Sequence, residues 1–228
     1  MRLTLALVAA AASLGSIHSL APDHWVPFAA LARAERWSAA RTAFVTALCG
    51  MGHVTVSVAL GLVSAFFGLE LLEAFGKRIE SLAGILLIGF GVVYGAWGLR
   101  RSLRSRWHDH GQAHSHSHWH AHDHGHSHEH RGPDEGRITA WTLFLLFSAD
   151  PCVAVIPLVF AAAPLGWIST LAVVGAYEAA TIGTMIALVL PARAATAAVR
   201  GAWVDRYGDA LAGAVIAAIG LIVVGLGL

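Results

Sequence analysis

Six long apolar stretches run along the chain, and they constrain its fold more than any other feature. A helix needs roughly 20 apolar residues to cross a bilayer core of about 30 Å. The stretches of that length are Leu3–Leu31, Thr42–Leu69, Ile79–Leu99, Ile138–Ala162, Trp167–Leu190 and Gly208–Leu228. The first starts like a signal peptide, but it continues past any small-residue cleavage site, so we expect a span. The sequence predicts an all-α membrane protein with about six transmembrane helices.

Composition agrees with a lipid bilayer as the surroundings of the chain. Hydrophobic residues make up 57% and charged residues 13% of the 228 residues, whereas ordinary soluble domains are about 25% charged. The net charge is +1 with histidine neutral, so no basic patch dominates. These values argue against a soluble enzyme, a disordered chain and a nucleic-acid binder. The two cysteines, Cys49 and Cys152, lie far apart and form neither a disulfide framework nor a CxxC metal knuckle.

The basic residues predict an orientation for the spans. One side of the predicted bundle carries Arg33, Arg36, Arg41, Arg100, Arg101, Arg104, Arg106, Arg131, Arg137, Arg193, Arg200 and Arg206. The other side carries only Arg2, Lys77 and Arg78. Cytoplasmic loops are enriched in Lys and Arg. We therefore expect the arginine-rich side to face the cytoplasm, and both termini to lie on the outer side of a bacterial inner membrane. Tryptophans, which favour membrane interfaces, lie near the predicted span edges at Trp25, Trp37, Trp97, Trp141, Trp167 and Trp203.

A short pattern of charged and small residues occurs twice. Residues 77–84 read Lys-x-x-Glu-x-Leu-Ala-Gly, residues 206–213 read Arg-x-x-Asp-x-Leu-Ala-Gly, and Gly91 matches Gly220 at the same offset. We therefore expect two membrane halves, 1–99 and 138–228, of three spans each, joined by a cytoplasmic histidine-rich loop over 100–137. An odd number of spans inverts the second half. Inverted repeats with broken helices are common in secondary transporters, whose sites lie at the repeat interface.

Ionisable groups are few within the predicted spans. Each costs on the order of 2.5–3.5 kcal/mol at a span centre and is a functional candidate by default. Away from the span edges they are His18, Asp23, His24, His53, Asp150 and Glu178. Four different spans thus bring polar groups into the apolar region.

The first cluster contains two histidines and an aspartate around a proline, in the order His18, Pro22, Asp23 and His24. Pro22 breaks or kinks a helix, which can turn the three side chains toward one point. His53 follows a glycine in the second span, so it is expected to face the bundle. Imidazoles and a carboxylate suit Ni, Co, Zn or Fe(II). We therefore predict a metal site from His18, Asp23, His24 and His53.

A second proline stands beside an acid in the fourth span, in Asp150-Pro151-Cys152, and predicts a second broken helix. Cys152 is either a soft metal ligand or a small hydrophobic side chain. Glu178 can bind metal, relay protons or pair with a buried histidine. Asp150, Cys152 and Glu178 are therefore candidates for a metal or proton site in the second half, whereas Cys49 is interpreted as packing.

Eleven of the 14 histidines lie between His108 and His130. Those at every second position are His114, His116, His118, His120, His122, His124, His126, His128 and His130. The tract has too few apolar residues to build a core and is expected to be disordered without metal. With a reference pKa near 6.5, roughly three quarters of its imidazoles are neutral at pH 7. We predict a loop that captures metal at many overlapping sites.

The His18-x4-Asp23-His24 motif, followed by Gly52-His53, resembles the nickel/cobalt transporter superfamily. The histidine-rich insert and Asp-Pro-Cys in the fourth span are similar to its NicO-type efflux branch. This resemblance implies a helical bundle that carries Ni²⁺ or Co²⁺, with His18, Asp23, His24 and His53 as the metal site. The chain differs from the eight-span uptake permeases of the superfamily in having six predicted spans.

The sequence favours a divalent-metal transporter that moves Ni²⁺ or Co²⁺, with Zn²⁺ or Fe²⁺ as further candidates. It has no phosphate-binding loop and no HExxH motif, so we expect neither ATP drive nor an intramembrane protease, and no enzyme activity or prosthetic group. Outward transport from the loop, with proton counterflow, is the leading interpretation. An uptake permease, or a membrane metal-donor protein for a metalloenzyme, remains an alternative function. The expected partners are divalent metal ions and the lipid bilayer, and a homo-oligomer is a possible assembly.

Overall fold

The computed structural model describes residues 1–67, 69–104, 133–150, 152–199 and 201–226, without the side chains of 63–67, 69–81, 83, 133–138, 153 and 202. Within these residues every regular element is a helix, which confirms the predicted all-α class for this part of the chain. The α-helices are α1 (Arg2–His18), α2 (Pro22–Ala34), α3 (Ala39–Phe67), α4 (Leu69–Arg104), α5 (Pro133–Ser148), α6 (Ile156–Ala162), α7 (Trp167–Ala198) and α8 (Ala202–Leu226). Two 3₁₀ turns, η1 (Val153–Val155) and η2 (Ala163–Leu165), flank α6.

The predicted helix break at Pro22 is confirmed. Helix α1 ends at His18, α2 begins at Pro22, and the two helices meet at a bend of 55°. Proline suits the first position of a helix because the amide hydrogen it lacks has no partner there in any case. The bend therefore places the end of one helix and the start of the next at the same depth in the bundle.

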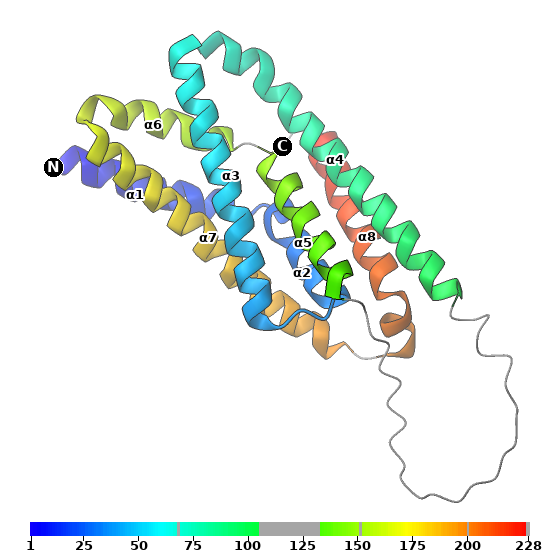
Figure 1. Cartoon of the computed structure of the whole chain (residues 1–228). Helices are drawn as coiled ribbons and strands as arrows, with labels where there is room; N and C mark the ends of the chain where they lie inside the picture. The colour runs from blue at the N-terminus through cyan, green and yellow to red at the C-terminus, as the bar shows by residue number, and fades with distance from the viewer. Residues whose placement is uncertain (68, 105–132, 151, 200, 227–228) are drawn as a thin grey trace, which may run out of the picture.

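The fourth apolar stretch is also interrupted. Helix α5 ends at Ser148, and the regular structure resumes with η1 at Val153. The chain thus shows the same order of elements twice, an interrupted pair followed by two long helices: α1–α2, α3, α4 and then α5–α6, α7, α8 (Figure 1).

Three described helical segments are long and apolar enough to cross a membrane: Ala39–Leu62, Trp167–Ala198 and Trp203–Leu226. The bent pair of α1 and α2 makes a fourth if it counts as one span. The apolar segments Thr139–Ser148 and Ile156–Leu165 are too short to cross singly, because each lies on one side of the second interruption. These helices are consistent with a membrane protein, and the count of six spans stays a prediction.

Helices α4 and α8 run side by side along their length (Figure 1) and are held together by glycines. A Cβ atom at Gly91 would collide with the backbone of Gly213 and Ala217, and one at Gly220 would lie 2.9 Å from Gly84 O. These are the glycines that the sequence pattern matched between the two halves. Because the contact is backbone against backbone, it requires glycine rather than a larger residue.

Helix α1 packs along α7 in the same direction. Thr4 Oγ1 lies 3.3 Å from Ser169 Oγ near the start of both helices. Further along, a Cβ atom at Gly15 would lie 2.7 Å from Tyr177 O and 2.9 Å from Thr181 Oγ1. The end of α1 is therefore pressed against the middle of α7.

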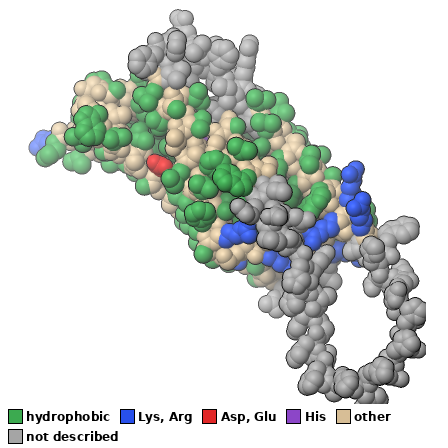
Figure 2. Space-filling model, viewed as in Figure 1, with side chains coloured by type: hydrophobic (Ala, Val, Ile, Leu, Met, Phe, Trp, Pro, Cys, Tyr) green, Lys and Arg blue, Asp and Glu red, His purple; other side chains and the backbone are tan. Residues whose placement is uncertain are grey.

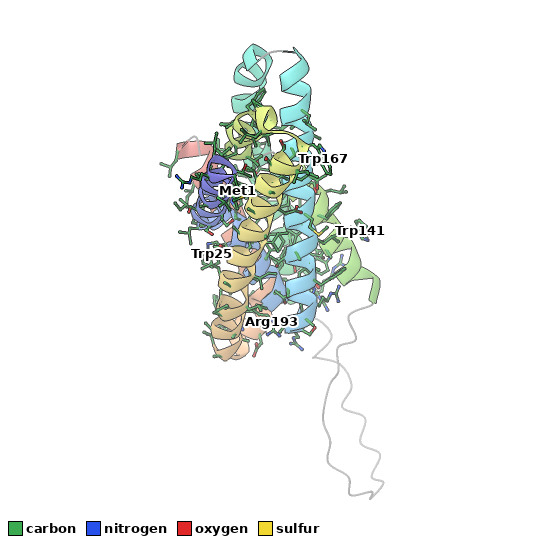
Figure 3. All side chains as sticks on the ribbon, turned by 90° about the vertical axis from the view of Figure 1, so that its left-hand side faces the viewer. Met1, Trp25, Trp141, Trp167 and Arg193 are labelled. Carbon is green, nitrogen blue, oxygen red and sulfur yellow. The ribbon has the colours of Figure 1, made fainter. Side chains whose placement is uncertain are left out.

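Some predicted details are corrected. The connection expected between Leu69 and Ile79 is part of α4, which begins at Leu69. Trp167 and Arg193 lie toward opposite ends of α7, as expected (Figure 3). Trp37, however, is 2% exposed and belongs to the core. Trp25 follows His24 at the helix break, where its Nε1 donates to Leu20 O.

Candidate metal centre

Three histidines from three helices meet at the first helix break. His18 ends α1, His24 lies in the first turn of α2, and His53 lies within α3. One ring nitrogen from each lies within 4.8 Å of the others. Two ligands about 2.1 Å from a common ion lie up to about 4.2 Å apart. Small side-chain shifts therefore suffice for all three histidines to bind one ion.

One ring nitrogen of each histidine, Nε2, is buried without a hydrogen-bond partner. His24 is 3% and His53 1% exposed, and Nε2 of His18, His24 and His53 makes no hydrogen bond. Buried polar atoms in proteins nearly always have a partner. Three neighbouring Nε2 atoms without partners therefore indicate a site that binds a ligand, rather than core histidines whose hydrogen bonds are all made within the protein.

Two neighbouring groups orient the rings. Asp23 Oδ2 lies 3.1 Å from His24 Nδ1, and Phe147 O lies 3.2 Å from His53 Nδ1. A carbonyl oxygen can only accept, so His53 carries its hydrogen on Nδ1 and leaves the Nε2 lone pair for a ligand. The carboxylate of Asp23 favours the same arrangement in His24.

Asp23 lies behind His24 and not among the three facing histidine nitrogens. It was predicted as a metal ligand beside them, but the compact group contains only the histidines. Its contact with His24 matches the carboxylate–histidine pairs that hold metal-binding imidazoles in place. The structure brings all four predicted residues into one site, three facing each other and one behind.

Packed apolar clusters lie on both sides of the histidines. On the side of the α2 C-terminus, the Phe147 ring lies 5.0 Å from Phe28, 5.6 Å from His24 and 5.1 Å from His53. On the other side, the Tyr177 ring lies 6.5 Å from His18 and belongs to a second cluster with Cys152 and Val155. The site is thus enclosed between two apolar layers.

The residues predicted for the second half fall into three different places. Asp150 lines a small cavity of about 20 Å³ that Asp23 also lines, which has room for about one water molecule. Cys152 is buried in the interruption after α5. Glu178 lies on α7, is half-buried, and is not part of the histidine group. The second interruption therefore adjoins the first rather than forming a distant counterpart.

Sequence reasoning missed three residues beside the site. Tyr177 Oη lies 2.7 Å from Cys152 Sγ. Ser57 Oγ accepts from Cys152 N at 2.6 Å and donates to His53 O at 2.6 Å. Thr181 Oγ1 is buried without a hydrogen bond of standard geometry. The position of Ser57 four residues after His53 is the usual spacing of a back-bonding serine and was available as a signal.

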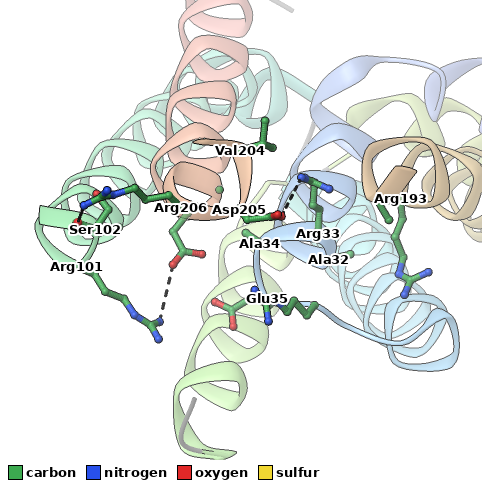
Figure 4. Close-up of a pocket in the computed structure, with 15 residues that line it drawn as sticks. Ala32, Arg33, Ala34, Glu35, Arg101, Ser102, Arg193, Val204, Asp205 and Arg206 are labelled. Atoms are coloured by element: carbon green, nitrogen blue, oxygen red, sulfur yellow. Dashed lines mark hydrogen bonds and ion pairs between the residues drawn. The ribbon is translucent and has the colours of Figure 1, made fainter. Parts of the chain in front are cut away.

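Arginines from three predicted connections meet at one end of the bundle. A recess of about 510 Å³ there is lined by Arg33, Arg36, Arg101, Arg193 and Arg206, together with three acidic residues (Figure 4). Figure 2 shows basic side chains gathered toward this end, while hydrophobic side chains cover most of the remaining visible face. The grouping that the charge pattern predicted is therefore present in the described residues.

These arginines bind the ends of helices. Arg33 donates to Thr196 O and Val199 O at the end of α7, and Arg206 donates to Ser102 O in the last turn of α4. The last carbonyls of a helix lack partners within the helix. A positive side chain there also complements the helix dipole. These arginines thus connect helix ends at the end of the bundle where α4 terminates at Arg104.

The nine alternating histidines from His114 to His130 lie outside the described residues. No family model matches the chain, and no curated protein or solved structure matches it. The chemical interpretation accordingly rests on the site itself. Three imidazole nitrogens oriented by a carboxylate and a carbonyl, inside apolar helices, are suited to holding a borderline divalent cation.

Proposed function

We propose that the chain is a transporter of divalent transition metals and that His18, His24 and His53 hold the ion in transit. The observation that carries this proposal is the meeting of three imidazoles at a helix break, with one ring nitrogen of each within 4.8 Å of the others and with Nε2 of each buried without a hydrogen bond. Such a break inside an apolar span is where transporters place ion sites, since irregular backbone is tolerated there when it lines a site.

The donor set supports the choice of ion. Imidazole nitrogen suits Ni, Co, Zn, Cu and Fe, whereas Mg²⁺, Ca²⁺ and Mn²⁺ favour oxygen ligands. Ni²⁺ and Co²⁺ are named first because the His18-x4-Asp23-His24 motif resembles the NicO-type branch of the nickel/cobalt transporters. Zn²⁺ and Fe²⁺ remain further candidates on the chemistry of the ligands.

Outward movement is the proposed direction, from a cytoplasmic histidine-rich loop across a bacterial inner membrane. The gathering of arginines around the recess supports a cytoplasmic location for that end. The repeated order of elements and the contact between Gly91 and Gly213 support an inverted repeat of three spans per half. In that arrangement the histidines lie near the midplane, where alternating access needs the site.

Proton counterflow is the proposed coupling. Metal binds to deprotonated ligands, so the arrival and departure of an ion exchange with protons. Asp23 and Asp150 line one small cavity beside the histidines and are the carboxylates best placed for this role. Glu178, which is half-buried on α7, is the other candidate from the sequence.

The test is metal flux into vesicles that contain the purified chain and a trapped metal indicator. Wild type is compared with His24→Ala, using Ni²⁺, Co²⁺, Zn²⁺, Fe²⁺ and Mn²⁺ in turn. The matched control is His118→Ala, which removes the same side chain from the loop. We expect saturable flux of Ni²⁺ or Co²⁺ that His24→Ala lowers to the level of empty vesicles and His118→Ala leaves unchanged.

Elution volume and helical circular dichroism show whether His24→Ala is folded. Full flux in folded His24→Ala contradicts the proposed site. Stoichiometric metal binding without any flux in the wild type favours a metal-donor protein instead. Comparing inside-out with right-side-out vesicles decides between export and uptake.

A further inference from the structure

A thiol and a phenol meet in the apolar layer next to the histidines. Cys152 is 2% exposed and Tyr177 fully buried, and Cys152 Sγ lies 2.7 Å from Tyr177 Oη. Cys152 comes from the interruption after α5, and Tyr177 from the middle of α7. Both residues therefore belong to the second half of the chain, while the three histidines belong to the first.

Cys152 is connected to the histidine site by two hydrogen bonds, and Tyr177 lies near it through its ring. The backbone N–H of Cys152 donates to Ser57 Oγ, and Ser57 Oγ donates to His53 O, each at 2.6 Å. The Tyr177 ring lies 6.5 Å from the His18 ring. Cys152 does not belong to the compact histidine group. The pair is thus a neighbour of the histidine site and not a part of it.

A third polar atom lies at the same place. Thr181 is fully buried, and its Oγ1 makes no hydrogen bond of standard geometry, although its side chain lies next to the Tyr177 phenol. A ligand bound at this place would therefore meet a third polar group, the Thr181 hydroxyl, beside the thiol and the phenol.

The pair lies on the side of the histidines away from the arginine-lined recess. Helices α1 and α7 run in the same direction, and Gly15 contacts Tyr177 and Thr181. Tyr177 is nearer to Trp167, where α7 begins, than to Arg193. Figure 3 shows Trp167 and Arg193 toward opposite ends of this helix. An ion moving outward from the recess would therefore meet the histidines first and the cysteine afterwards.

Sulfur adds a selectivity that imidazole alone does not provide. A thiolate is a soft ligand that binds Zn²⁺, Co²⁺ and Ni²⁺ well and contributes little to Mg²⁺ or Mn²⁺ sites. We propose that Cys152 and Tyr177, with Thr181 beside them, form a second metal subsite that receives the ion from the histidines. This inference rests on the proposed transport function. On binding, an S–metal bond replaces the S–H bond of Cys152, and the proton is released to the medium.

Cobalt provides a direct test because thiolate-bound Co²⁺ has an intense near-ultraviolet charge-transfer band that histidine-bound Co²⁺ lacks. The chain contains only two cysteines, Cys49 and Cys152, so the histidine-rich loop cannot produce the band. Full-length protein in detergent is titrated with Co²⁺ as wild type, Cys152→Ser and Cys49→Ser. Cys49 is a matched control, since it is also buried and free but packs in the other apolar cluster.

We expect the band in wild type and in Cys49→Ser and its loss in Cys152→Ser, with the visible bands of histidine-bound Co²⁺ retained in all three. Elution volume and helical circular dichroism show whether Cys152→Ser is folded, because the loop histidines give visible bands in any variant. Tyr177→Phe keeps the ring and removes the hydroxyl, and it should raise the Co²⁺ concentration that half-saturates the band several-fold.

The absence of the band in wild type at saturating Co²⁺, or its persistence in Cys152→Ser, overturns the subsite. Neither result affects the flux test with His24→Ala. Conversely, a wild type that shows the band but moves no metal refutes transport while leaving the thiolate ligand established. The two proposals therefore fail in distinguishable ways.

Discussion

The two interrupted helices use the same structural device for different purposes. Around the first interruption, between α1 and α2, His18 and His24 present imidazoles to the centre of the site. Around the second, between α5 and η1, Phe147 presents a backbone carbonyl to His53, and Cys152 presents a thiol to Tyr177. One interruption supplies nitrogen side chains, and the other supplies a carbonyl and sulfur.

The difference shows that a helix break is useful in two ways. A break frees side chains to converge, and it frees carbonyls that a continuous helix would use for its own hydrogen bonds. The first interruption brings side chains together, and the second presents a freed carbonyl. Because they adjoin, the second half of the chain can orient the ligands that the first half provides.

The largest expected effect on flux comes from removing a histidine at the first interruption. An acidic residue removed at the second interruption provides the comparison. His18→Ala deletes one of three converging nitrogens and should lower the flux of Ni²⁺ or Co²⁺ at saturating metal by roughly tenfold or more, since even residues that only orient a ligand account for that much. Asp150→Ala removes no metal ligand but a carboxylate proposed for proton coupling, so it should lower this flux less than His18→Ala does and mainly change the dependence of flux on pH. Initial rates in vesicles measure both. Equal losses would mean that the two interruptions contribute equally to holding the ion.

A smaller effect is expected when the support of one imidazole is weakened. Asp23→Asn keeps the size of the side chain but removes the charge 3.1 Å from His24 Nδ1. The half-saturating metal concentration should rise by about 10-fold, within the range found for carboxylates behind metal-bound histidines. The control is Asp205→Asn, which alters an exposed carboxylate near Arg33. An unchanged half-saturating concentration in Asp23→Asn would show that Asp23 does not orient His24.

The smallest effect at saturating metal is expected from the histidine-rich tract, which belongs to neither interruption. Deleting 108–130 should raise the half-saturating metal concentration roughly 3- to 10-fold, because a tethered loop raises the local concentration of metal. Maximal flux should stay close to wild type, and the number of ions bound per chain at equilibrium should fall sharply. Loss of maximal flux in a correctly inserted protein would place the tract in the transport pathway.

Much of the site was predictable because proline and buried charge leave strong signals. Pro22 predicted the break, and the scarcity of ionisable residues in apolar segments singled out His18, His24 and His53. The distinction between these histidines and Asp23 was not predictable, since it depends on a bend of 55° that no residue type specifies. The same bend brings Trp25, which follows His24, within hydrogen-bond distance of Leu20 O.

The remaining contacts had weaker signals or none. The carbonyl of Phe147 reaches His53 across 94 positions in the sequence, and backbone groups carry no residue-specific pattern. Tyr177 stood next to Glu178, which drew attention because of its charge, yet the tyrosine contacts Cys152 and the glutamate lies outside the histidine group. The charge of Glu178 therefore pointed to the right turn of α7, but not to the tyrosine beside it that contacts Cys152.

The glycine contact between α4 and α8 has a consequence for the synthesis of the chain. Ribosomes deliver α4 to the membrane well before α8, and domains are generally completed from the N-terminus. Until α8 arrives, the glycines of α4 leave a strip of backbone without the close helix partner that covers it in the folded chain. Chains interrupted before residue 202 should therefore be preferred substrates for membrane proteases.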